Sequence, residues 1–155
     1  MAKKSSFVLG TLIVLAAIFT AAALFANNSQ TVSRYDETIT IGDINYQADI
    51  ARTVTDLQHG LSDSPQIAAD QAMVFIFPTL SKWGIWMKDM NYPIDILWLD
   101  KAKKVQHIVE DAQPDSYPET SFYPPSDARY VIELKSGTVK DKRITIGTQA
   151  AFNAE

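Results

Sequence analysis

The sequence contains no cysteine and only two histidines among its 155 residues. The missing cysteines exclude disulfides, thiolate nucleophiles and a lipid anchor on cysteine. His59 and His107 stand far apart, without the spacing of a metal-binding motif around either. Glycine-rich phosphate loops and G-x-S-x-G nucleophile elbows are also missing. We therefore expect no metal site and no cofactor.

Basic charge is scarce too, and most of the chain is acidic. Lys3 and Lys4 are the only charged residues before Arg34, so the rest of the chain carries 12 Lys and Arg against 18 Asp and Glu, a net charge of -6. Nucleic-acid binding depends on basic side chains that neutralise phosphates. The charge pattern therefore excludes a nucleic acid as the expected partner.

Long apolar runs are confined to one place, the uncharged segment 7–26. Twenty helical residues span about 30 Å, the thickness of the hydrocarbon core of a bilayer. Lys3 and Lys4 would stay in the cytoplasm by the positive-inside rule, which sends the rest of the chain across the membrane. A cleaved signal peptide over 1–26, ending at a site such as Ala21-Ala22-Ala23, is the alternative. Both interpretations predict export: a single transmembrane helix at 7–26 contacts the membrane, or the chain is secreted.

The remainder is expected to be a mainly β domain over 38–155, after a polar linker over 27–37. Short strands with turns every 8 to 12 residues indicate a small antiparallel β-barrel or sandwich with one or two short helices. A hairpin is expected at the Gly42-Asp43 turn, and a short helix from Thr53 or Thr55 to Gly60. The predicted strands cover 38–41, 44–50, 73–77, 84–87, 94–100, 105–109 and 130–134.

Large aromatic side chains cluster in the middle of this domain, where all three tryptophans lie between residues 83 and 98. Core packing is the expected role of Trp98 and Met73, which stand within apolar strands. Trp83 and Trp86 are three residues apart, so strand alternation leaves at least one of them facing the surface. An exposed tryptophan beside the proline-rich loop 113–126 would offer a stacking platform for a sugar ring or peptide.

Two acidic residues stand inside apolar strands, Asp95 between isoleucines and Glu133 between Ile and Leu. Three roles fit this pattern. In the first, strand alternation turns both acids to solvent. Alternatively, the acids have a structural role, as ion pairs with Arg129 and Lys88 or as hydrogen-bonded caps, or they bind or act on a substrate. An acid–base pair for glycoside hydrolysis would place both carboxyl groups in one cleft, about 5 to 9.5 Å apart.

Several elements at this spacing resemble the signature of domain-of-unknown-function family 192, over about residues 44–152. They are Gly60-Leu61, Met73-x-Phe75, Trp86-Met87-Lys88, Pro93-Ile94-Asp95-Ile96, Pro114, Tyr130-Val131-x-Glu133-Leu134, Gly137 and Ile146-Gly147. The resemblance implies a small β-rich domain that is often exported, and it implies no activity. The matching positions are the candidates for a shared ligand-binding site: Trp86, Met87, Lys88, Asp95 and Glu133.

The chain departs from the family pattern at Ala72, Ile85 and Thr148. It also departs in the segment 62–64, because the family commonly has an arginine a few positions after the Gly-Leu element and this chain has Ser62-Asp63-Ser64 there. We expect a membrane-tethered, non-catalytic module that binds an envelope glycan or protein. Its contacts would be Trp86, Lys88 and the aromatic residues of the proline-rich loop, Tyr117, Phe122 and Tyr123. The alternatives are a hydrolase that uses Asp95 and Glu133, and an assembly role with other envelope proteins.

Overall fold

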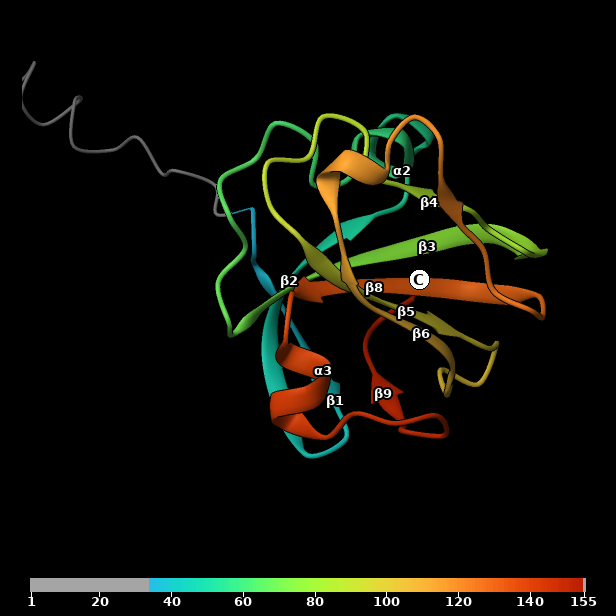
Figure 1. The fold of residues 1–155 in the computed structure, drawn as a ribbon. Helices are drawn as coiled ribbons and strands as arrows, with labels where there is room; N and C mark the ends of the chain where they lie inside the picture. Colours follow the sequence, from blue (N-terminus) through green and yellow to red (C-terminus); the bar gives the residue numbers. More distant parts are fainter. Residues whose placement is uncertain (1–33, 155) are drawn as a thin grey trace, which may run out of the picture. The chain divides into compact units, whose positions relative to one another are not determined.

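The computed structural model describes residues 34–154 (Figure 1). The predicted anchor or signal peptide at 1–26 and most of the predicted linker lie outside this part of the chain. Within the described residues, no helix is long and apolar enough to cross a bilayer. The folded unit begins at Arg34, ahead of the predicted domain start at residue 38.

The domain is mainly β, and one sheet dominates it. Seven strands form this sheet in the order β6-β5-β8-β3-β2-β1-β9, and β4 and β7 form a separate two-stranded sheet. The elements are β1 (Glu37–Ile41), β2 (Ile44–Ala51), α2 (Val54–His59), β3 (Gln71–Ser81), β4 (Ile85–Trp86), β5 (Ile94–Leu99), β6 (Val105–Ala112), the 3-10 helix η1 (Pro114–Ser116), β7 (Ser121–Phe122), β8 (Ala128–Lys135), α3 (Thr138–Lys142) and β9 (Ala150–Ala151).

The hairpin at the start of the domain is confirmed. Ile41 pairs with Ile44 across the turn, and Gly42 has a φ of 59°, a conformation that favours glycine. The next pairing corrects the expected all-antiparallel arrangement, because β2 and β3 are parallel, with Asp49 opposite Met73. Parallel neighbours need a crossover connection over one face of the sheet. Residues 52–70, including α2, make that crossover.

The predicted helix after β2 is confirmed as α2. The Thr53 hydroxyl accepts a hydrogen bond from the backbone N–H of Asp56 at 3.2 Å and caps the helix N-terminus. Gly60 ends the helix with φ 52° and ψ -126°. A Cβ atom at Gly60 would lie 3.0 Å from the ring of Phe75, so both backbone conformation and packing require glycine here.

The large sheet curls into a half-barrel. At one edge β9 pairs with β1, and the residues just before β9 reach the start of β6 at the other edge. Lys104 and Gln149 form an antiparallel bridge, and the Val105 N–H donates to the Thr148 carbonyl at 2.9 Å. The chain end therefore fastens the two edges of the sheet to each other, as Figure 1 shows beside β9.

The two faces of the sheet carry separate apolar cores. One core joins the sheet to α3 and the chain end, and its members include Tyr46, Leu97, Ile132, Val139 and Phe152. The other lies on the face that α2 and the loops around β4 cover (Figure 1). Its members include Met73, Phe75, Met87, Ile96, Trp98 and Val131. The core positions expected for Trp98 and Met73 are confirmed, with exposed fractions of 0% and 2%.

Local irregularities account for the remaining differences from the expected pattern. Simple alternation along the predicted strand 105–109 would place Val105 and His107 on the same face of the sheet. An irregularity between Trp98 and Leu99 shifts the register, so the two residues face different cores. Val105 joins the first core, whereas His107 lies beside the Trp98 ring of the second, with ring centroids 5.3 Å apart. The turn expected at Gly137 continues into the unpredicted helix α3.

Asp95 is one of the two acids that the sequence places inside apolar strands, and it is completely buried. Its carboxylate accepts hydrogen bonds from the backbone N–H of Asp111 at 2.9 Å and of Val139 at 2.8 Å. Of the three roles considered for Asp95, the hydrogen-bonded cap is the observed one. It joins the end of β6 and the first turn of α3 to the buried strand β5.

We predict that Asp95→Ala lowers the free energy of unfolding by about 2–5 kcal/mol, because it leaves one buried and one partly buried N–H group without an acceptor. Asp95→Asn keeps one acceptor oxygen and is expected to cost less. Urea denaturation followed by far-UV circular dichroism measures both variants. Glu119→Ala, in an exposed loop, is the control and should match the wild type; equal stability of Asp95→Ala and the wild type would contradict the assigned role.

Candidate functional site

A pocket of about 340 Å³ opens on the face of the sheet that α2 covers. Its volume falls in the range of sites for small molecules. Apolar side chains form most of its wall, and its residues come from α2, the turn after it, β3, the segment around β4 and β8. They are Val54, Leu57, Gln58, His59, Gly60, Leu61, Ser62, Phe75, Phe77, Pro78, Trp83, Gly84, Ile85, Trp86, Met90 and Glu133.

Stacked aromatic rings hold one side of this pocket in place. The Trp83 ring lies parallel to that of Phe77, with centroids 4.3 Å apart and planes 7° apart. The Trp83 indole N–H donates to the Thr79 carbonyl at 2.9 Å, and its own carbonyl accepts from the buried Trp98 indole at 2.8 Å. These contacts fix Trp83 as a rigid wall, because both its backbone and its ring have partners.

The position of Glu133 follows from its register in the sheet. Glu133 lies in β8 opposite Met73 of β3 on one side and Ile96 of β5 on the other. Directly opposed residues in neighbouring strands point to the same face, so its side chain points toward the core that contains Met73 and Ile96. The Glu133 carboxyl group therefore lies at the base of the pocket, with only 4% of the residue exposed.

Glu133 also has an unsatisfied oxygen. Among the described residues, its Oε2 atom is buried and has no hydrogen-bond partner. Burial in apolar surroundings disfavours the charged form of the carboxyl group and raises its pKa to about 8, although the positive charge of Arg34 acts in the opposite direction. The pocket thus holds a carboxyl group that is largely protonated at pH 7 and has a free oxygen.

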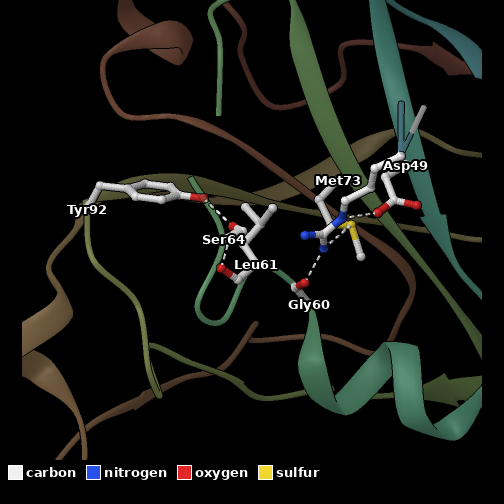
Figure 2. A network of polar contacts seen from close by, with 7 residues as sticks. Asp49, Gly60, Leu61, Ser64, Met73 and Tyr92 are labelled. Carbon is white, nitrogen blue, oxygen red and sulfur yellow. Dashed lines mark hydrogen bonds and ion pairs between the residues drawn. The ribbon is translucent and has the colours of Figure 1, made fainter. Parts of the chain in front are cut away.

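Arg34 lines a second, smaller hollow of about 240 Å³. His59 and Gly60 line both this hollow and the pocket. Its guanidinium group forms an ion pair with Asp49 and donates to the carbonyl of Gly60, as the dashed lines to those two residues in Figure 2 show. It also lies 4.0 Å from the Met73 sulfur. Arg34 therefore joins the start of the domain to β2 and to the end of α2.

The loop after α2 is held by a further set of polar contacts. The Ser64 hydroxyl donates to the Leu61 carbonyl at 2.6 Å and lies 2.8 Å from the Tyr92 hydroxyl (Figure 2). The Ser62 hydroxyl donates to the Lys88 carbonyl at 2.8 Å. These contacts tie the turn that lines the pocket to the segment between β4 and β5.

The model of the family DUF192, described as "Uncharacterized ACR", matches residues 37–152. The chain belongs to the DUF192 family. This confirms the resemblance drawn from the motifs. The comparison with curated proteins gives no match.

Two solved structures share the fold of this DUF192 domain. A candidate transcription regulator from Sinorhizobium meliloti 1021 is 25% identical, with a TM-score of 0.69, and the match covers 74% of this chain and 92% of that one. A protein of unknown function from Novosphingobium aromaticivorans DSM 12444 is 21% identical, with a TM-score of 0.70, covering 74% of this chain and 84% of that one. The second likeness establishes the fold alone.

The five residues expected to form a shared site do not all meet in the DUF192 domain. Glu133 and Trp86 line the pocket, and Trp86 is 46% exposed, as expected for one of the paired tryptophans. Lys88 is exposed, lines a shallower hollow beside the pocket and forms an ion pair with Asp89 at 3.0 Å. Met87 is 1% exposed and belongs to the core.

The ion pairs considered as one alternative for the two strand acids do not form in the described part of the chain. Within residues 34–154, neither Lys88 nor Arg129 forms a salt bridge with Asp95 or Glu133. The cation that influences Glu133 is Arg34. Sequence reasoning assigned Arg34 to the linker, and no local motif marks it as part of the domain.

The pairing of Asp95 and Glu133 in one cleft is wrong as well. Asp95 lies opposite Leu134, and its neighbour Ile96 lies opposite Glu133. Successive residues of a strand point to opposite faces. The two acids therefore lie on opposite faces of the sheet and cannot act together on one bond.

We predict that Glu133→Gln changes how stability depends on pH. The folded-state pKa of Glu133, about 8, exceeds its ordinary value of 4.5, so the folded state binds the proton more tightly than the unfolded state. The wild type should therefore lose stability relative to the variant as pH rises from about 4.5 to 8, by up to roughly 1 kcal/mol per pH unit.

Urea denaturation of both proteins at several pH values between 5 and 8 measures this difference. Glu119→Gln, in an exposed loop, should keep the pH dependence of the wild type. A constant difference between Glu133→Gln and the wild type across this range would show that Glu133 titrates normally.

Proposed function

We propose that this DUF192 domain is a non-catalytic module that binds a small, largely apolar molecule at the cell envelope. The observation that carries the proposal is the pocket itself, which combines aromatic walls with one buried carboxyl group whose Oε2 has no partner among the described residues. A few polar groups in a mostly apolar cavity are typical of small-molecule sites.

Binding is favoured over hydrolysis by the placement of the acids. Glu133 is the one carboxyl group among the described residues that line the pocket, and Asp95 lies on the other face of the sheet. An acid–base mechanism on a glycosidic bond needs two carboxyl groups flanking that bond. A single neutral carboxyl group suits recognition of a polar group on a ligand.

The shallower hollow beside the pocket extends the proposed site toward solvent. It is lined by Lys88, Asp89, Tyr117 and four residues that also line the pocket, namely Gln58, His59, Ser62 and Trp86. Trp86 and Tyr117 are exposed aromatic residues. We propose that they contact the outer part of the ligand, such as a sugar ring or a peptide of the envelope.

The cellular location is part of the same proposal. The apolar run 7–26, preceded by Lys3 and Lys4, supports export of the domain, either tethered by this segment or released from it. The net charge of -6 beyond the two lysines does not favour binding to DNA. Regulation of transcription by contact with DNA is therefore not carried over from the Sinorhizobium protein.

We predict that 1-adamantanol, a compact neutral probe, binds in the pocket. In two-dimensional NMR, the indole N–H signals of Trp83 and Trp86 should shift more than that of Trp98, because Trp83 and Trp86 line the pocket and Trp98 does not. Leu57→Phe should weaken binding at least about tenfold by filling space with a larger side chain. The matched control is Thr55→Phe on the exposed part of the same helix, since Thr55 does not line the pocket.

Equal binding by Leu57→Phe and Thr55→Phe, or no shift of either pocket tryptophan with the wild type, would contradict the proposed site. The folded state of each variant is checked by the dispersion of its amide spectrum.

We also predict that the protein isolated from its native cells is found outside the cytoplasm. Intact-mass measurement distinguishes the two forms of export, because a tethered chain retains residues 1–26 and a processed chain begins near Leu24 or Asn27. A full-length chain in the soluble cytoplasmic fraction would contradict export.

A further inference from the structure

The chemistry of the pocket wall indicates what kind of polar group the ligand carries. Four aromatic rings line the pocket, from Phe75, Phe77, Trp83 and Trp86, and neither lysine nor arginine is among its lining residues in the described part of the chain. Aromatic faces attract cations. A carboxyl group at the base and aromatic rings around it together make the pocket complementary to a positive charge.

We propose that the ligand is an apolar amine, whose ammonium group enters the pocket and donates a hydrogen bond to Oε2 of Glu133. The proposal deepens the proposed function and rests on it. It stands on the burial of Glu133 at the base of the cavity and on its oxygen without a partner. An ammonium group on an otherwise apolar molecule satisfies that oxygen with a charge-assisted hydrogen bond, while its apolar part contacts the rings.

The charged and titratable groups around Glu133 are compatible with this assignment. Arg34 acts on Glu133 electrostatically, but its guanidinium is engaged by Asp49 and the Gly60 carbonyl in the neighbouring hollow. Tyr35 and Tyr92 stay uncharged at neutral pH, because burial raises the pKa of each phenol above 10. His59 is the remaining titratable group on the pocket wall, contributed by α2.

The binding step must release a proton at neutral pH. In the empty pocket Glu133 is largely a neutral acid, since its pKa is about 8. When an ammonium ion binds, the Glu133 O–H bond breaks, its proton passes to the solvent, and the carboxylate and the ammonium form an ion pair. At pH 7 this uptake releases most of one proton per ligand, and it lowers the affinity relative to an already ionised carboxylate. Affinity should therefore rise with pH and level off above pH 8.

Three probes of one shape test the proposal: 1-adamantanamine, 1-adamantanol and 1-adamantanecarboxylate. Isothermal titration calorimetry of the wild type at pH 7 measures their affinities, and titration in phosphate and in Tris, which have different ionisation enthalpies, gives the number of protons released. We expect the amine to bind at least about tenfold more tightly than the alcohol, with proton release, and the carboxylate to bind more weakly than the alcohol.

Two variants locate the effect. Glu133→Gln should bind the alcohol within about threefold of the wild type, lose the preference for the amine and release no proton. His59→Gln is the control, because His59 is the other titratable side chain among the described residues that line the pocket. It should keep both the preference and the proton release at pH 7. Retained binding of the alcohol shows that each variant is folded. The affinities of the three probes for the wild type test the proposal even if a variant does not fold.

The outcomes separate this inference from the proposed function. If the alcohol binds and the amine binds no better, or binds without releasing a proton, the pocket is a site for neutral apolar molecules and the amine assignment is overturned. If none of the three probes binds, the proposed function falls with it. A preference for the amine that survives in Glu133→Gln would also overturn the assignment, because another group would then be the counter-ion.

Discussion

The parallel pairing of β2 and β3 constrains the rest of the pocket face. Two parallel neighbours cannot be joined by a tight turn, so the chain between them must cross one face of the sheet. That crossover carries α2, the Gly60 turn and the loop held by Ser62 and Ser64. Because α2 has only six residues, the crossover leaves part of this face open to the pocket. The pocket is the space that remains between this cover, β3 and the segment around β4.

The two buried acids show how differently one sequence pattern can be used. Asp95 and Glu133 both stand between large apolar residues, in neighbouring strands, and both are almost fully buried. Asp95 faces the side where α3 and the end of β6 supply two N–H donors, so its burial stabilises the fold. Glu133 faces the incompletely covered side, where burial without a partner for Oε2 raises its pKa. The two acids differ in the segments that pack over each face of the sheet. The sequences of β5 and β8 alone do not determine which segments these are.

Local signals predicted much of the fold, and non-local pairings account for what they missed. Gly42, Thr53 and Gly60 act through their own backbone and nearest neighbours, so the hairpin and α2 could be located from the sequence. The family motifs likewise identified Glu133 and Trp86, two residues that line the pocket. The parallel pairing and the register shift at β6 depend on which strands meet, information that periodicity does not contain. The strand register also decides that Asp95 and Glu133 lie on opposite faces of the sheet, so the sequence alone could not show this.

Arg34 links these observations, because it lies within the predicted linker but belongs to the folded unit. The family pattern commonly has an arginine soon after the Gly-Leu element, and this chain has Ser62, Asp63 and Ser64 there. Arg34 instead brings a guanidinium to the Gly60 carbonyl from the start of the domain, and its ion pair with Asp49 fixes it beside Met73. A cation held there by its own partners lowers the cost of ionising Glu133 without bonding to Oε2. That oxygen therefore has no partner within the described residues, and the charge of Arg34 partly offsets the burial that favours the protonated carboxyl group.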